Sequence, residues 1–347
     1  MLRKSIRESQ AMDRGPIIEQ LFQEQLDKYY ASPSSGFHDE KLTRKFYEQK
    51  LRHLAWKPYP KDELVTFGAS GTDKCDREVV FKHGGTKVQK SEDIPFRGRQ
   101  RRAGNAVVDF TQLDLVHMEK RLGKDALFTV PINEYGDWMF EDAVQTRKVF
   151  EYDGVKFAIT AKPDGILRYE GDLIIFEYKT KATGIREMNG KLDFKGPQVD
   201  HLRQVTAESL VFGIKERIIL YESLHKPAWF SDEENKSVPK TRKTWLNGEP
   251  VPDTRAFYSY VTDKAQEELL SDLAKQAKLI YAGKLPEMTI EMTGKCGFCP
   301  YNEKCKASLS ESEVRMLRES EERYTHSSLA GKSDHRNLVS YLESVKI

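Results

Sequence analysis

The stretch GDLIIFEYKTKA, residues 171–182, passes from apolar side chains to charged ones within one predicted strand. Side chains alternate along an extended strand, so Glu177 and Lys179 project from one face while Tyr178 projects from the other. Asp164 precedes a second short apolar segment, and twelve residues separate it from Glu177. A tight hairpin between the two segments would place Asp164 beside the Glu177 end. The sequence therefore predicts two carboxylates and one ammonium at the rim of a buried sheet.

Two carboxylates in this position suit a hard divalent cation. Mg²⁺ and Mn²⁺ prefer oxygen ligands and usually keep waters or substrate phosphate oxygens in the remaining positions. Such an ion polarises a phosphorus centre and stabilises a leaving oxygen, while Lys179 would orient or deprotonate the attacking water. The competing interpretation is a plain turn at Asp164 and a surface salt bridge between Glu177 and Lys179. Charged side chains without a function are unexpected at the end of a buried strand reading LIIF. We therefore favour a site for phosphodiester hydrolysis over the structural interpretation.

The order of these residues resembles the PD-(D/E)xK nuclease superfamily, in which an Asp and a Glu-x-Lys lie on neighbouring strands of a mixed sheet. His117, on a helix before the sheet, matches the metal-binding histidine of the RecB-like branch. Gln204, on the helix after the sheet, matches the first residue of its Gln-x-x-x-Tyr motif, but Glu208 stands where the tyrosine is expected. The resemblance implies Mg²⁺ or Mn²⁺ held by His117, Asp164 and Glu177, and a catalytic set of Asp164, Glu177, Lys179 and Gln204.

The four cysteines have the spacing of a metal site. Cys296, Cys299 and Cys305 lie close together, and Cys75 stands about 220 residues earlier. Thiolates suit iron–sulfur clusters and zinc, although zinc modules more often show two close pairs. The pattern resembles the iron–sulfur nucleases, among them the AddB nuclease domains and the CRISPR-associated RecB-like exonucleases. This resemblance implies a [4Fe-4S] cluster on all four cysteines, with zinc and free thiols as the alternatives.

Two basic segments are candidates for nucleic-acid contact. RGRQRR lies in a predicted glycine-punctuated loop over 82–102, and KTRKTW lies in a polar insertion over 226–256. Guanidinium and ammonium groups bind phosphates and an indole stacks on bases, but solvated loops have the same composition. The candidates for nucleic-acid binding are Arg97, Arg99, Arg101, Arg102, Lys240, Arg242, Lys243 and Trp245.

Composition bounds the class of protein. The 347 residues carry a net charge of only +2, which excludes a uniformly basic protein, while 32% charged residues predict an ionic surface. Neither a membrane-spanning run nor a secretory signal is visible, so we expect a cytoplasmic protein that does not enter a membrane. No P-loop motif is present, so any unwinding of DNA would come from a helicase or recombination partner. A homo-oligomer is equally compatible with the long helical additions.

Periodicity predicts the elements that position the site. Helices are expected over 17–30 and 39–56, from about residue 70 through Cys75, and from Gly104 through 122. Hairpins are expected over 149–161 and 165–179, then a helix over 197–212 with Gly213 as its cap, a strand over 217–223 and a helix over 263–283. This predicts three regions: an N-terminal helical region (1–62), a nuclease domain (63–308) with the insertion 226–256, and a C-terminal helical tail (309–347).

The predicted fold is therefore α/β, with a restriction-endonuclease-like mixed sheet flanked by helices. The predicted function is a metal-dependent deoxyribonuclease, above all an exonuclease on single-stranded or unwound DNA ends in recombination, repair or phage- and CRISPR-type DNA processing. The alternatives are a structure-selective endonuclease on the same core and a non-catalytic DNA-end-binding subunit.

Overall fold

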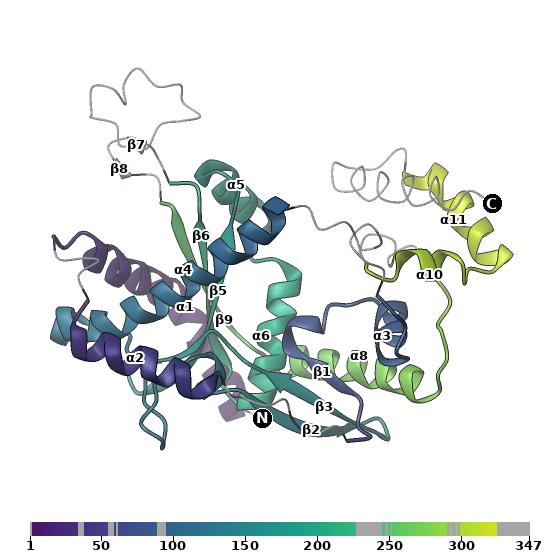
Figure 1. Ribbon diagram of the computed structural model, residues 1–347, viewed down its shortest axis with the longest axis horizontal. Coiled ribbons are helices and arrows are strands. Elements are labelled where there is room, and N and C mark those ends of the chain that lie inside the picture. The colour runs from purple at the N-terminus through teal and green to yellow at the C-terminus, as the bar shows by residue number, and fades with distance from the viewer. Residues whose placement is uncertain are drawn as a thin grey trace.

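The structure is a computed structural model, and it describes residues 2–33, 38–54, 59, 62–88, 95–226, 245–246, 249–250, 252–289, 292, 296 and 299–324. Its centre is a mixed sheet with helices packed on both faces (Figure 1). The predicted α/β class, with a mixed sheet flanked by helices, is confirmed.

The larger sheet has the order β4-β5-β6-β9 and contains β4 (Gly165–Tyr169), β5 (Asp172–Lys181), β6 (Glu216–Ser223) and β9 (Thr254–Tyr260). β5 pairs antiparallel with β4 and parallel with β6, which makes it a central strand. Ile174, Ile175 and Phe176 are each at most 1% exposed, because both faces of β5 are covered.

A smaller sheet has the order β1-β3-β2, from β1 (Thr66–Gly68), β3 (Val155–Ala161) and β2 (Thr146–Tyr152). The turn between β2 and β3 has positive φ at Asp153 and Gly154, and the turn between β4 and β5 has positive φ at Glu170 and Gly171. Two-residue hairpin turns require this left-handed backbone, which glycine adopts without strain. Both predicted hairpins are confirmed.

Helices cover the two faces of the larger sheet with different partners. On one face α1 (Leu2–Tyr30), α2 (Glu40–His53) and α4 (Pro95–Leu122) pack against Phe176, Tyr178 and Leu220. On the other face α5 (Ile185–Lys195) and α6 (Val199–Phe212) pack against Ile219 and Tyr221. α6 and α8 (Asp263–Tyr281) also cover the smaller sheet. Tyr178 therefore faces α4, and the residues on either side of it face α6.

The remaining elements are short or lie toward the C-terminal end. They are η1 (Ala69–Gly71), α3 (Asp76–His83), η2 (Gly123–Asp125), η3 (Glu141–Ala143), β7 (Trp245–Leu246), β8 (Glu249–Pro250), α10 (Asn302–Lys306) and α11 (Glu311–Tyr324). Figure 1 shows α10 and α11 beside α3 and α8, on the side of the molecule away from α1 and α2.

The predicted loop over 82–102 is wrong in its second half. α4 begins at Pro95 rather than at Gly104, so Arg97, Arg99, Arg101 and Arg102 lie on its first turns. Proline suits the first turn of a helix because that position has no intrahelical acceptor for an N–H. The arginine-rich segment is therefore helical.

Two other helix boundaries differ from the prediction. α1 begins at Leu2 and continues through Pro16, where Gly15 packs so closely that a Cβ would lie 2.8 Å from the ring of Tyr258. Cys75 is the N-cap of α3 rather than a residue inside it, and its Sγ accepts the N–H of Glu78 at 3.3 Å. The Asp39 cap of α2 and the left-handed Gly213 cap of α6 are confirmed.

The sequence patterns missed α5 and β9, and β9 begins at Thr254 inside the predicted insertion. Lys240, Arg242 and Lys243 lie outside the described residues, and Trp245 begins β7. The division into three regions stays a prediction. Among the described residues, no helix combines the length and the apolar character that crossing a membrane requires.

Candidate active site

The register of the β4–β5 hairpin sets Asp164 beside Glu177. Gly165 pairs with Phe176, so the residue before β4 meets the residue after Phe176 on β5. One carboxylate oxygen of Asp164, Oδ2, accepts the backbone N–H of Tyr178 at 2.7 Å. The predicted return of the hairpin to the charged end of β5 is confirmed.

Lys179 and Gln204 hold the carboxylate of Glu177 from one side. Glu177 is 3% exposed, and its Oε1 accepts from Lys179 Nζ at 2.6 Å and from Gln204 Nε2 at 2.7 Å. The Gln204 amide oxygen in turn accepts from Lys179 Nζ at 3.0 Å. The prediction that Glu177 and Lys179 share a face is confirmed, and that face is covered by α6.

Glu208 is a third buried carboxyl in the cluster. It lies one turn after Gln204 on α6, is 0% exposed, and its Oε1 accepts from Gln204 Nε2 at 3.0 Å. If Asp164, Glu177 and Glu208 were all ionised beside Lys179, the cluster would hold two excess negative charges in a space that excludes water. Burial, and after it the charge of Glu177, raises the pKa of Asp164 and of Glu208 well above its ordinary value.

The pKa of Lys179 is raised as well, but for a different reason. Burial, the largest single effect, lowers the pKa of this lysine, and the nearby carboxyl groups, Glu177 foremost, together more than offset it. The pKa of Lys179 is therefore raised, and its ammonium keeps its proton at neutral pH.

The cluster retains acceptor capacity that the protein itself does not use. Oε2 of Glu177 and Oε2 of Glu208 are buried without a hydrogen-bond partner. Buried carboxylate oxygens without a partner are unfavourable, and a divalent cation would satisfy them. No three His, Cys, Asp or Glu side chains within the described ranges are arranged as ligands of one ion. The donor set therefore fits an ion held by two carboxylates and completed by water or substrate oxygens.

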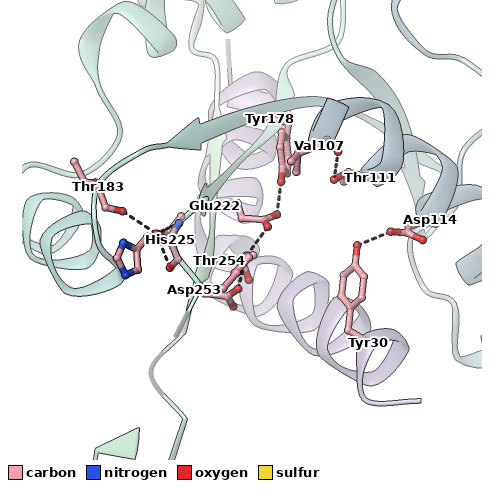
Figure 2. A network of polar contacts seen from close by, with 12 residues as sticks. Tyr30, Val107, Thr111, Asp114, Tyr178, Thr183, Glu222, His225, Asp253 and Thr254 are labelled. Atoms are coloured by element: carbon pink, nitrogen blue, oxygen red, sulfur yellow. Dashed lines mark hydrogen bonds and ion pairs between the residues drawn. The ribbon is translucent and has the colours of Figure 1, made fainter. Parts of the chain in front are cut away.

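The opposite face of β5 anchors the strand. The Tyr178 hydroxyl donates to Glu222, and nearby Tyr30 donates to Asp114 Oδ2 at 2.8 Å (Figure 2). Burial, and after it the charge of Glu222, raises the pKa of Tyr178, so the phenol stays protonated. The first bond ties Tyr178 of β5 to β6 on the face opposite Glu177 and Lys179, and the second ties α1 to α4, which cover that face.

His117 lies in a different environment from the carboxylates. It is 1% exposed, its Nδ1–H donates to Leu113 O at 2.8 Å, and its Nε2 accepts the backbone N–H of Asp39 at 2.9 Å. Its ring lies 4.7 Å from that of His38. The lone pair that a metal ion would need is thus used to hold the start of α2, and the structure does not bring His117 together with Asp164 and Glu177.

Gln112 reaches the site from α4 instead, and the sequence patterns did not identify it. Its Nε2 donates to the backbone carbonyl of Asp164 at 2.8 Å, and its Oε1 is buried without a partner. The segment 107–118 (VVDFTQLDLVHM) holds several polar residues, so the sequence carries no signal that singles out Gln112. Glu208, in contrast, follows from the sequence, because its spacing from His201 and Gln204 predicts one polar face of a helix bordering the site, and it does lie beside Gln204.

The arginines of α4 lie toward the carboxyl end of β5. Gly104 packs so closely on this strand that a Cβ would lie 3.0 Å from Thr180 Oγ1. α4 continues past this contact toward its N-terminus, where Arg97, Arg99, Arg101 and Arg102 are exposed. The first turns of α4 therefore extend past the same end of the strand that carries Lys179.

The four cysteines gather in one region although they are far apart in the sequence. Cys296 and Cys305 are buried beside Val314 and Leu317 of α11. Burial, together with the charges of the other cysteines, raises the pKa of Cys75 to about 11 and of Cys296 to about 12. Arg77 Nε donates to Cys305 Sγ at 3.2 Å. The four thiols are free and near one another, but no three of them stand in the geometry of a metal site within the described residues.

Comparison with known proteins gives no family assignment: no family model and no curated protein matches the chain. Among solved structures, SSO0001 is 16% identical, with a TM-score of 0.38 over 78% of this chain and 95% of that chain. An alkaline exonuclease (LHK-Exo) from Laribacter hongkongensis is 10% identical, with a TM-score of 0.34 over 62% and 88%. A phage-related exonuclease from Haemophilus somnus 129PT is 12% identical, with a TM-score of 0.26 over 63% and 96%. The function proposed below rests on the geometry of the site rather than on these distant likenesses.

Proposed function

We propose that the chain is a divalent-metal-dependent deoxyribonuclease of the PD-(D/E)xK type. One observation carries the proposal: Asp164, Glu177 and Lys179 meet at the end of a buried central strand, and Oε2 of Glu177 is buried there without a hydrogen-bond partner. Burying charged groups that have no function would lower the stability of the fold. A divalent ion with a phosphodiester substrate accounts for their presence. The sequence resemblance adds the preference for exonuclease action on single-stranded or unwound ends.

In this proposal Asp164 and Glu177 hold Mg²⁺ or Mn²⁺, which when bound would polarise the phosphodiester and stabilise the leaving oxygen. Tyr178 N–H and Gln112 fix Asp164, while Gln204 fixes Glu177. Lys179 acts as a charged donor that orients water and neutralises charge developing on phosphorus, because its raised pKa disfavours a role as a base. The protein thus supplies positioning and electrostatic stabilisation.

Hydrolysis of end-labelled oligonucleotides with Mn²⁺ tests this function. The proposal expects degradation of single-stranded DNA that stops when the ion is chelated. Circular single-stranded DNA separates an exonuclease, which needs an end, from an endonuclease on the same core. DNA binding without hydrolysis in the presence of every divalent ion would instead support a non-catalytic DNA-end-binding subunit. The same assay with RNA oligonucleotides establishes whether the protein prefers DNA or RNA.

The proposal also assigns the contacts with DNA, the location of the protein and its partners. The exposed arginines of α4 (Arg97, Arg99, Arg101 and Arg102) would contact DNA phosphates near the end of β5, and Lys240, Arg242, Lys243 and Trp245 keep their predicted role as DNA contacts. A cytoplasmic location and a helicase or recombination partner remain part of the proposal.

His117 gives a prediction that separates a structural role from that of a ligand. Replacing it with alanine leaves the Asp39 N–H without its partner, which costs about 1–3 kcal/mol, whereas the Leu113 carbonyl keeps its backbone hydrogen bond within α4. We expect a lower melting temperature, with Mn²⁺-dependent hydrolysis retained by the folded fraction at low temperature. Loss of all hydrolysis in a fully folded His117→Ala protein would restore the predicted role of His117 as a ligand.

We also propose that the four cysteines, Cys75, Cys296, Cys299 and Cys305, hold a [4Fe-4S] cluster that joins α3 to the C-terminal segment. Their convergence and the chemistry of four thiols support it, and zinc is the alternative with the same donors. A cluster closing so long a loop would stabilise the fold by restricting the unfolded chain.

This proposal predicts a brown protein containing iron and sulfide when it is purified without oxygen. The variant Cys299→Ser is expected to lose the visible absorption and several degrees of melting temperature. Metal analysis and absorption spectroscopy on the same sample check both. A colourless protein carrying one zinc ion, or no metal with unchanged stability in Cys299→Ser, would contradict the cluster.

A further inference from the structure

A cavity of about 550 Å³ opens at the carboxyl end of β5, between α5 and the start of α6. Lys181 and Thr183 line it from the end of the strand, and Met188 and Leu192 line it from α5. Lys181 lies two residues after Lys179, so both project from the same face of β5. The cavity is therefore next to the proposed active site along the strand.

Positive charge gathers in this cavity. Lys181, Lys191 and Lys195 line it, and Asp73 and Asp200 are the opposing carboxylates in its lining. Burial lowers the pKa of Lys181, and the charges of Lys179 and Lys191 lower it further, against the effect of Asp200. Lys191 is paired with Glu187 at 2.6 Å, so Lys181 and Lys195 are the ammonium groups that gain most from a bound anion, and phosphate is the anion that a nucleic acid provides.

An exposed aromatic residue lies beside these lysines. Phe194 is 86% exposed, and it lies three residues after Lys191 and directly before Lys195 on α5. Positions three residues apart in a helix are neighbours on its surface. Val199, at the start of α6, is 70% exposed and lines the cavity. An apolar ring next to phosphate-binding groups suits a nucleobase, whose flat face stacks on it.

We infer that the cavity and Phe194 form a holding site for single-stranded polynucleotide. The lysines contact backbone phosphates, and Phe194 stacks on a base beside the phosphate that the active site cleaves. The location beside a cleaved phosphate rests on the proposed function, whereas the binding itself does not. The strand must be unpaired, because the faces of bases inside a duplex are already stacked on each other. The site therefore selects single strands over duplexes.

Fluorescence anisotropy with a labelled oligothymidylate of about twenty nucleotides, without divalent ions, tests the inference. Phe194→Ala is expected to weaken binding roughly 5- to 100-fold, and duplex DNA of the same length is expected to be affected less than about two-fold. Lys195→Gln is expected to reduce the slope of log affinity against log salt by about 0.7, the value for one phosphate contact on a single strand.

The matched control is Tyr135→Ala, since Tyr135 is 80% exposed like Phe194 but lies outside α5 and has no lysine of the cavity next to it in the sequence. Equal affinities for Phe194→Ala and Tyr135→Ala would overturn the inference. Dimerisation that Phe194→Ala abolishes while DNA affinity stays unchanged would also overturn it, by assigning this face to a second copy of the chain.

The experiments distinguish a failure of the holding site from a failure of the proposed nuclease function. If wild-type protein hydrolyses DNA but Phe194→Ala binds single strands normally, the holding site is wrong and the nuclease stands. If Phe194 is needed for binding but no divalent ion supports hydrolysis, the holding site stands and the nuclease is wrong.

Discussion

Replacing Asp164 with asparagine is expected to lower Mn²⁺-dependent DNA hydrolysis by roughly 10²- to 10³-fold, the cost of removing a preorganised electrostatic group. The asparagine side chain still has an oxygen that accepts the Tyr178 N–H, so the hairpin should keep its register. It lacks the charge that holds a divalent ion beside Glu177. Initial rates on a labelled single strand, with circular dichroism to confirm folding, check this prediction.

Asp153→Asn is the matched control for this substitution. Asp153 lies in the β2–β3 turn with positive φ, a backbone that asparagine accepts, and its partner is the surface residue Lys278. Its hydrolysis rate is expected to equal that of the wild type. An Asp164→Asn protein that cleaves DNA as fast as Asp153→Asn would remove Asp164 from the site.

Replacing Lys179 with methionine is expected to affect stability as well as hydrolysis. The side chains of Lys179 and Glu177 are 20% and 4% exposed, so their ion pair is largely shielded from water. Removing one partner of such a pair leaves an uncompensated buried charge, at a cost of about 3–5 kcal/mol. Urea unfolding monitored by circular dichroism should show this loss at neutral pH, and hydrolysis should also be abolished.

The double variant Lys179→Met/Glu177→Gln separates the two effects. The neutral glutamine can still accept from Gln204, so most of the lost stability is expected to return. Hydrolysis is expected to stay absent, because both the charged donor and one carboxylate are missing. If the single variant were as stable as the wild type, or if the double variant cleaved DNA, the assigned roles would be contradicted.

The arrangement of Asp164, Glu177 and Lys179 could be predicted because it depends on short-range geometry. Alternation along a strand fixed which side chains share a face, and a two-residue turn fixed the register that brought Asp164 back to Glu177. Both features depend only on residues 164–179, and few other arrangements satisfy them.

The environment of His117 could not be predicted in the same way. Its position on the helix before the sheet was right, but the direction of its ring depends on how α2 packs against α4. That packing depends on contacts between residues far apart in the sequence. Gln112, five residues earlier on α4, could not be predicted for the same reason. Its contact with Asp164 joins residues far apart in the sequence.

The lysine-lined cavity was missed because α5 was missed. Residues 185–195 include Gly190 and only two buried residues, Met188 and Leu192, so the apolar periodicity that identifies a helix is weak. The glycines of 82–102 predict a loop there, whereas Pro95 starts α4 and places the arginines on its first turns. Both helices pack against residues distant in the sequence, α5 against Ile219 and Tyr221 of β6 and α4 against Thr180 of β5, and local patterns do not show such contacts.

The most direct test of the central claim is a crystal structure of the protein with Mn²⁺, using anomalous scattering to locate the ion. We expect one strong peak within about 2.0–2.3 Å of a carboxylate oxygen of Asp164 and of Glu177, the range of such metal–oxygen bonds. The account would be contradicted if crystals at saturating Mn²⁺ showed no anomalous peak between these two carboxylates. A fully occupied Mn²⁺ ion bound only elsewhere in the protein would contradict it as well.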